Sequence, residues 1–241
     1  MESVRQVLRR QCDEDWDGVE YFGLDAPMRM LRSLLHGIIE HKHSESALLV
    51  GASGTGKTSL LYKILADLRA TMENPLDLVV IELSGLLHFE PRVACQEILE
   101  VLDPNTKQAG SFDEAGEMIL QHLKKEKRMY ILVLDQLDLF ATLQSGKQSL
   151  LYFLFDLLHH PDLSMGIIGT TTRLDCISLL EKRVISRFSQ IQIQFYPPED
   201  IFHYLLLVQQ RLLISPMSTK KHNLSSSLVK EYNESVQVGD E

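Results

Sequence analysis

Residues 47–58 read ALLVGASGTGKT, and this stretch decides the fold of the chain. Its first four residues are apolar and predict a short buried strand, which the glycine-rich segment Gly51–Thr58 follows directly. Apolar side chains at helical spacing come next, so the glycine-rich segment opens a helix. A strand, such a loop and a helix N-terminus together form a phosphate-binding loop, in which backbone N–H groups surround phosphate oxygens.

The loop residues have distinct expected tasks in binding ATP with Mg²⁺. We expect Lys57 to reach the β- and γ-phosphates and the hydroxyl of Thr58 to ligate Mg²⁺. The backbone that would cradle the phosphates belongs to Gly51, Ala52, Ser53, Gly54, Thr55 and Gly56. The alternative is a glycine-rich turn that matches by chance, which average residue frequencies allow in only about one chain in a hundred of this size.

Apolar runs and helical patterns alternate along the chain, and this alternation predicts a doubly wound parallel α/β sheet. The expected strands are Ala47–Val50, Leu78–Leu83, Met129–Leu134, Met165–Ile168 and Gln190–Phe195. The expected helices are Pro27–Lys42, Thr58–Met72, Arg92–Leu102, Glu114–Lys125, Gln148–His160, Ser178–Ile185 and a last one that follows Pro198 and runs to about Leu213. Ligands of such sheets bind at the carboxyl ends of the strands, where the glycine-rich loop lies.

We expect three segments along the chain. Residues 1–20 would form an N-terminal helix and a linker, and residues 21–196 the nucleotide-binding domain. Two helices rather than one separate the second and third strands, so residues 84–127 read as an insertion. Residues 197–241 would add one helix and a polar tail that ends without a closing structural element.

Composition limits the possible partners. The chain has 241 residues, 44% of them apolar, which suffices for one sizeable core. Its formal net charge is −9, whereas free-standing DNA binders usually have a basic surface, so DNA contacts would come from local patches or partner subunits. The three cysteines show no metal-ligand spacing. The sequence has neither a signal-peptide pattern nor an apolar run of transmembrane length, so we expect a soluble intracellular protein without membrane contact.

A second acidic position follows the third expected strand. Asp135 comes directly after the apolar strand Met129–Leu134 and could hold Mg²⁺ through its water shell; the alternative is an aspartate that caps a turn. Gln136 comes next, and an amide cannot accept a proton at neutral pH, so it can only orient water. ATP binding is therefore a firmer expectation than ATP hydrolysis. If the strand continues, Asp138 points to the other side.

These motifs resemble the AAA+ ATPases, and more narrowly the subunit 4 family of the eukaryotic origin recognition complex. Four stretches carry the resemblance: Gly51–Thr58, Ile131–Phe140, Gly169–Asp175 and Leu179–Phe188. The family typically has a glutamate at the position of Gln136. The glutamine here departs from that pattern, and the property it affects is the chain's own ATP hydrolysis. The resemblance implies that residues 197–241 are the start of a helical lid. The rest of the lid and a C-terminal winged-helix domain have no counterpart, so we expect a partial chain.

The resemblance also implies roles for residues outside the loop. Tyr21, Phe22 and Gly23 would pass beside the adenine, and Thr171 would monitor the γ-phosphate from the sensor 1 position. Arg187 matches the arginine finger, which serves the nucleotide of a neighbouring subunit. A guanidinium can fork two phosphate oxygens and offset the charge that develops during transfer. From residue chemistry alone, a surface salt bridge is the simpler interpretation of Arg187.

The implied function is that of an ATP-binding subunit of a hetero-oligomeric origin recognition complex. Its partners would be the other subunits and origin DNA, in the nucleus, at the initiation of DNA replication. The charged helix end Lys124–Arg128 is a secondary candidate for DNA contact, because the corresponding insertion contacts DNA in related initiators. The alternatives are a nucleotide-switch signalling ATPase of a related P-loop class and a small-molecule kinase. The string Ser186–Phe188 favours the initiator over both.

Overall fold

The structure, a computed structural model, describes residues 8, 21, 23–88, 90–106, 108–126, 128–141, 147–198, 200–214 and 225–236. The chain divides into two compact units, of which the larger is Ala26–Tyr196. The smaller unit comprises Met1–Asp25 and Pro197–Glu241. Among the residues described, no helix is both long and apolar enough to cross a membrane.

A five-stranded parallel sheet in the order β2-β3-β4-β1-β5 forms the centre of the larger unit. Its strands are β1 (Glu45–Gly51), β2 (Leu78–Ser84), β3 (Met129–Asp135), β4 (Ser164–Thr171) and β5 (Ile191–Phe195). Val50 at the end of β1 pairs with Thr171 at the end of β4, so these carboxyl ends lie at one edge of the sheet. The predicted doubly wound parallel sheet is confirmed, with small shifts at the strand ends.

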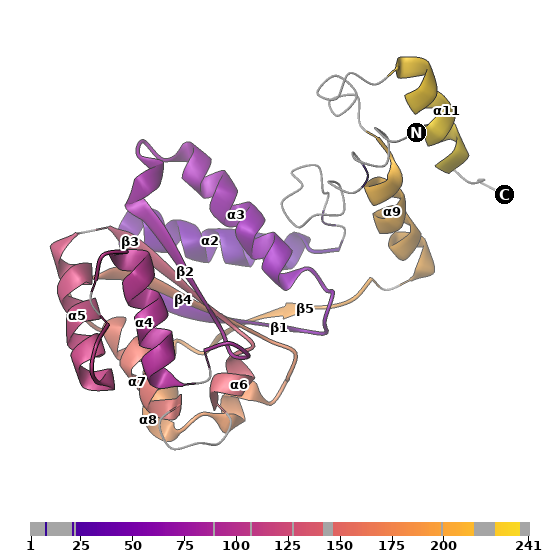
Figure 1. Ribbon diagram of the computed structural model, residues 1–241. Coiled ribbons are helices and arrows are strands. Elements are labelled where there is room, and N and C mark those ends of the chain that lie inside the picture. Colours follow the sequence, from indigo (N-terminus) through magenta and orange to yellow (C-terminus); the bar gives the residue numbers. More distant parts are fainter. Residues whose placement is uncertain are drawn as a thin grey trace. The chain divides into compact units, whose positions relative to one another are not determined.

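Helices cover both faces of this sheet. They are α2 (Asp25–His41), α3 (Lys57–Thr71), α4 (Pro91–Leu102), α5 (Phe112–Lys125) and α7 (Lys147–Leu157). Figure 1 shows α2 and α3 on one face and α4, α5 and α7 on the other. Alternate residues of β3, Tyr130, Leu132 and Leu134, join the buried cluster with α4, α5 and α7. Residues 84–127 contain two helices, as predicted.

The segment after β3 departs from the expected course. Gln136 has a φ of +56°, which ends the strand, and a short helix, α6 (Leu137–Ala141), follows at once. Asp138 therefore lies in the first turn of α6 rather than on a continued strand. The side that we expected Asp138 to face was inferred from a strand that does not continue.

The prediction of one helix over Ser178–Ile185 was wrong. A 3₁₀ turn, η2 (Cys176–Leu179), is followed by a separate short helix, α8 (Lys182–Ile185). The break lies where the side chain of Gln148 bonds the C=O of Leu179 and the N–H of Glu181. A continuous helix would use these backbone groups itself, so a tertiary contact replaces the local pattern.

The smaller unit contains the predicted helix after residue 198, α9 (Ile201–Leu212), and a second helix, α11 (Ser226–Val236). The prediction of a tail without a closing element was therefore wrong for residues 226–236. Asn233 on α11 accepts the N–H of Ile214 at 2.9 Å and donates to its C=O at 3.0 Å. The expected N-terminal helix and linker at 1–20 lie, apart from Leu8, outside the described residues.

Candidate nucleotide-binding site

The glycine-rich loop joins the end of β1 to the start of α3. Gly54 and Gly56 have φ angles of +77° and +87°, a region that glycine enters without strain. A Cβ on Gly51 would lie 2.4 Å from the carbonyl oxygen of Phe195 on β5. Backbone conformation and close packing thus account for all three glycines of the motif.

The first turn of α3 presents an uncapped helix N-terminus. Its N-cap residue is Gly56, which has no side chain to accept the first N–H groups, and the first turn contains no acidic residue. The N-terminus of a helix carries the positive end of the helix dipole. Such an end favours an anion, and phosphate is the anion that the loop sequence predicts.

Lys57 is the first residue of α3 and is only 8% exposed. Its Nζ donates to the carbonyl oxygens of Gly51 and Ala52, both at 2.8 Å. Burial lowers the pKa of Lys57, and the charge of Asp135 partly opposes that shift. Neutral carbonyls are weaker partners for an ammonium group than phosphate oxygens are. The lysine therefore lies where a nucleotide phosphate would improve its interactions.

Asp135 lies at the end of β3, on the same sheet edge as the glycine-rich loop, with β4 between their strands. The hydroxyl of Thr170 donates to Oδ1 of Asp135 at 2.6 Å. The N–H of Gln136 donates in turn to Oγ1 of Thr170 at 3.3 Å. The carboxylate is therefore oriented by the neighbouring strand before any ligand binds.

The residues at this edge fit a metal that arrives with a nucleotide. Mg²⁺ usually takes one or two carboxylates together with phosphates and water, rather than an all-protein cage. In the described part of the chain, no group of three or more His, Cys, Asp or Glu residues is placed to hold a metal. Asp135 and the hydroxyl of Thr58 would complete the ligands of an ATP-bound Mg²⁺.

Two adjacent threonines at the end of β4 contact different acids. Thr171, which is 2% exposed, donates to Oδ1 of Asp138 at 2.7 Å and so holds α6. Thr170 is the one of the two that contacts Asp135. Sequence reasoning missed Thr170, although the run of three threonines at 170–172 was a signal that more than one could face the acidic turn. The sensor role of Thr171 stays a prediction.

Backbone hydrogen bonds hold Gln136 in place. Its C=O accepts the N–H of Leu139 at 2.9 Å, and the C=O of Asp135 accepts the N–H of Gly85 at 2.9 Å. The Oε1 atom of Gln136 is buried and has no hydrogen-bond partner among the described residues. An amide at this position provides no general base for water.

The expected adenine-side residues lie in the smaller unit or outside the described part of the chain. Gly23 has a φ of +72°, and the C=O of Tyr21 accepts the N–H of Leu24 at 3.3 Å, which forms a tight turn. Phe22 lies outside the described residues. Contact of Tyr21, Phe22 and Gly23 with adenine stays a prediction.

Arg187 follows α8 and is held on the surface of α7. Its Nε donates to Oδ1 of Asp156 at 2.7 Å, and its second terminal nitrogen donates to the hydroxyl of Tyr152 at 2.8 Å. The guanidinium carbon lies 4.2 Å from the centre of the Tyr152 ring. Sequence reasoning missed both partners; their i, i+4 spacing on α7 was the available signal. A guanidinium has more donors than these contacts use, so it can bind a second partner.

The charged helix end shows partial pairing. Lys124 and Lys125 are exposed in the last turn of α5, and Nε of Arg128 lies 3.2 Å from Oε2 of Glu126. Lys127 lies outside the described residues. A DNA contact at this patch stays a prediction.

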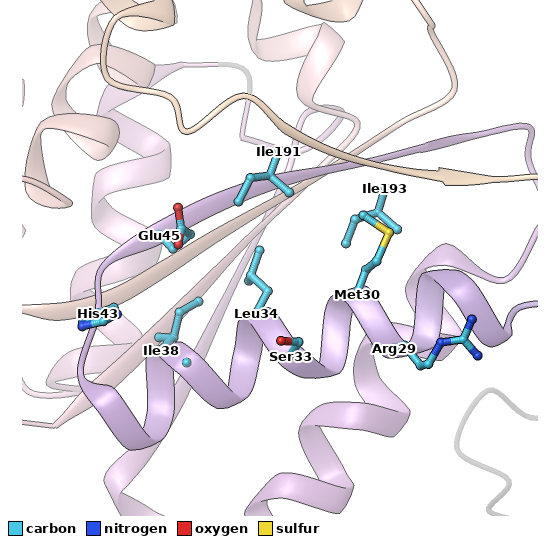
Figure 2. Close-up of a pocket in the computed structure, with 10 residues that line it drawn as sticks. Arg29, Met30, Ser33, Leu34, Ile38, His43, Glu45, Ile191 and Ile193 are labelled. Atoms are coloured by element: carbon cyan, nitrogen blue, oxygen red, sulfur yellow. The ribbon is translucent and has the colours of Figure 1, made fainter.

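A separate groove lies between α2 and β5, as Figure 2 shows, with a volume of about 530 Å³. Its apolar lining includes Met30, Leu34, Ile38, Ile191 and Ile193. Arg29 lies toward one end, and His43 and Glu45 lie toward the other. None of its lining residues belongs to the glycine-rich loop or the acidic turn, so the groove is distinct from the candidate nucleotide site.

Comparison with known families agrees with the nucleotide-binding site that the geometry indicates. The family model described as "AAA ATPase domain" matches residues 20–168. The chain belongs to the AAA ATPase domain family. This AAA ATPase is 33% identical over 220 residues to the origin recognition complex subunit 4 of Homo sapiens, an alignment that covers 88% of this chain and 50% of the relative. It is 34% identical over 194 residues to the origin of replication complex subunit 4 of Arabidopsis thaliana, covering 76% of this chain and 45% of the relative.

Solved structures agree with this assignment. The structure of the Aeropyrum pernix ORC1 protein in complex with DNA is similar to this AAA ATPase at a TM-score of 0.71 and 26% identity, over 86% of this chain and 52% of the other. The present chain spans about half the length of the curated relatives it matches. The family match, residues 20–168, includes the phosphate loop and the acidic turn.

Proposed function

We propose that this AAA ATPase is the ATP-binding part of an origin recognition complex subunit, which acts with the other subunits on origin DNA at the initiation of replication in the nucleus. One observation carries this proposal: the phosphate loop and Asp135, which Thr170 orients, lie at the same edge of the sheet. The chain is also similar to subunit 4 relatives over most of its length.

In this proposal the loop backbone and Lys57 bind the phosphates of ATP, while Thr58 and Asp135 hold its Mg²⁺. Bound Mg²⁺ neutralises phosphate charge. Thr171 would respond to the γ-phosphate through its bond to Asp138, which belongs to the helix directly after the acidic turn. With Gln136 next to Asp135, the site is better suited to holding ATP than to cleaving it.

Arg187 would act on a second nucleotide, held by the adjacent subunit. Its contacts with Asp156 and Tyr152 support this role, because they keep the guanidinium on the surface of α7, where a neighbouring chain can meet it. The hydrogen bond that Arg187 donates to the carboxylate of Asp156 raises the pKa of Arg187 above its already high value, so the side chain is charged at neutral pH. An arginine finger contributes about 10³–10⁵ in rate where it has been measured.

The test is ATP hydrolysis by origin recognition complexes reconstituted with wild-type chain or with Arg187→Ala. We expect the variant to suppress hydrolysis by the whole complex while leaving ATP affinity of the isolated chain nearly unchanged. Arg187→Lys is the matched control and should restore little, because a point charge cannot make the forked contact. Normal hydrolysis by the Arg187→Ala complex would overturn the finger assignment, and loss of ATP binding by the isolated chain would place the arginine in its own site.

A further inference from the structure

Gln148, in the first turn of α7, is a buried polar residue outside the nucleotide site. It is 9% exposed, and its amide is fully engaged. Nε2 donates to the C=O of Ala141 at 2.8 Å and to the C=O of Leu179 at 3.1 Å. Oε1 accepts the N–H of Glu181 at 3.2 Å. One side chain therefore joins the end of α6, the end of η2 and the start of α8.

One of the segments that Gln148 joins, α6, follows the acidic turn of the nucleotide site, and another, α8, precedes Arg187. Helix α6 follows directly from the turn that carries Asp135, and Asp138 on α6 is bonded to Thr171. Helix α8 leads within two residues of its end to Arg187, whose N–H donates to the C=O of Val184 at 3.0 Å. The start of α8 thus determines where the backbone of Arg187 lies.

Besides Gln148, α8 is directed by its second residue, Arg183, whose guanidinium carbon lies 5.3 Å from the centre of the Tyr152 ring on α7. The helix has only four residues, far fewer than a helix needs for stability on its own, so tertiary contacts must hold it. Glu181 is its N-cap and makes no side-chain capping bond. Leu180, Val184 and Phe188 are buried and hold the segment against the core, but apolar contacts are not directional. The bonds of Gln148 are directional, and they act on both sides of the break between η2 and α8.

We propose that Gln148 is a positioning residue for Arg187: it fixes where α8 begins relative to α6, and through α8 it fixes where the guanidinium is presented. This inference rests on the proposed role of Arg187 as an arginine finger. Asp156 and Tyr152 then hold the side chain, while Gln148 holds the backbone from which that side chain extends. The finger is thereby attached to the same helix, α6, that follows the metal-binding turn.

The experiment uses the reconstituted complex and Gln148→Met, which keeps the length of the side chain and removes every hydrogen bond. A displacement of about 1 Å can cost up to about a hundredfold in rate, so we expect kcat of the complex to fall by about ten- to a hundredfold. The KM for ATP should stay unchanged, as should ATP affinity of the isolated chain, because no residue of the phosphate loop is touched.

Ser44→Ala is the matched control. Ser44 also bridges two segments, since its hydroxyl donates to the C=O of Leu163 at 3.0 Å and accepts the N–H of Met165 at 3.2 Å. It lies where β1 and β4 begin, at the other end of the sheet from the nucleotide site. Comparison of thermal unfolding between the two variants separates lost stability from lost position. If Gln148→Met does not fold, Gln148→Asn carries the same test, because it keeps a neutral amide and shortens the side chain by one methylene, so that the amide no longer reaches all three backbone groups.

The deciding measurement is the double variant. If Gln148 acts through Arg187, Gln148→Met should cause no further loss in an Arg187→Ala background. An equal loss in both backgrounds, or a loss no larger than that of Ser44→Ala, would overturn the inference while leaving the finger assignment intact. If Arg187→Ala alone leaves hydrolysis by the complex normal, the finger assignment fails and the inference fails with it.

Discussion

Lys57 holds its ammonium group against two carbonyl oxygens of its own loop, at 2.8 Å each. This arrangement satisfies the charge incompletely, since burial still lowers the pKa of Lys57. Asp135 is oriented by Thr170, and the uncapped start of α3 adds further attraction for anions. At the scale of residues, Lys57 and the N-terminus of α3 therefore both form more favourable electrostatic interactions when a phosphate binds.

The first prediction concerns Lys57→Met. Loss of a charge-assisted contact should weaken ATP binding by about 1.5–3 kcal/mol, or about ten- to a hundredfold. A lysine whose pKa is lowered by folding destabilises the folded state at every pH below that pKa, and methionine removes this cost. The ATP-free variant should therefore melt no lower than wild type but gain less stability from ATP. Titration calorimetry and thermal unfolding with and without Mg-ATP measure both effects; an unchanged dissociation constant would exclude Lys57 from phosphate binding.

The second prediction concerns Gln136. The isolated wild-type chain should bind ATP but release phosphate far more slowly than an ordinary enzyme turnover of about 10 per second. Gln136→Glu should not lower that rate, because it adds a carboxylate where the amide oxygen is buried, and burial raises a carboxyl pKa toward the range suited to a general base. Steady-state phosphate release by both proteins is the measurement. Wild-type turnover at an ordinary rate would contradict the interpretation that the site lacks a general base because Gln136 stands there.

Elements that depend on local pattern were predictable, and those that depend on distant contacts were not. The strands appeared as short apolar runs because both faces of the sheet are covered by helices (Figure 1). The phosphate loop appeared because its parts are contiguous. The prediction at Ser178–Ile185 failed because Gln148, from another helix, takes two backbone groups there. The bond between Thr170 and Asp135 joins residues 35 apart, which no local pattern encodes.

The third prediction tests the junction of β1 and β5. Gly51→Ala would place a Cβ 2.4 Å from the Phe195 carbonyl oxygen, and relief would require the two strands to separate. We expect a loss of about 1–3 kcal/mol in the free energy of unfolding, typical of overpacking. Gly37→Ala is the control, because a Cβ there meets nothing within 4 Å and alanine is favoured over glycine in a helix by about 0.8–1 kcal/mol. Denaturant unfolding should therefore show shifts of opposite sign; equal shifts would show that the junction tolerates a side chain.

At the scale of the whole molecule, charge and function have to be reconciled. The chain is formally −9, yet the proposed function places it on DNA. Binding to a duplex gains most of its non-specific affinity from cations that release counterions from phosphates. The exposed Lys124 and Lys125 provide only a small local patch on an acidic molecule. In the proposed complex, this chain would therefore contribute nucleotide binding and Arg187, and most of the cations that meet DNA would come from other subunits.

The fourth prediction follows from the expectation that other subunits provide most of the cations that bind DNA. The isolated chain should bind a labelled DNA duplex more weakly than about 10⁻⁴ M at physiological salt, the weak limit of ordinary non-specific binding. The reconstituted complex that contains the same chain should bind measurably, with an affinity that falls steeply as salt rises. Fluorescence anisotropy across a salt series measures both. Replacing Lys124 and Lys125 with alanine in the complex should reduce the salt dependence only slightly, because two phosphate contacts are the most these residues can make. Tight, salt-dependent binding by the isolated chain would instead locate the DNA-binding surface on this subunit itself.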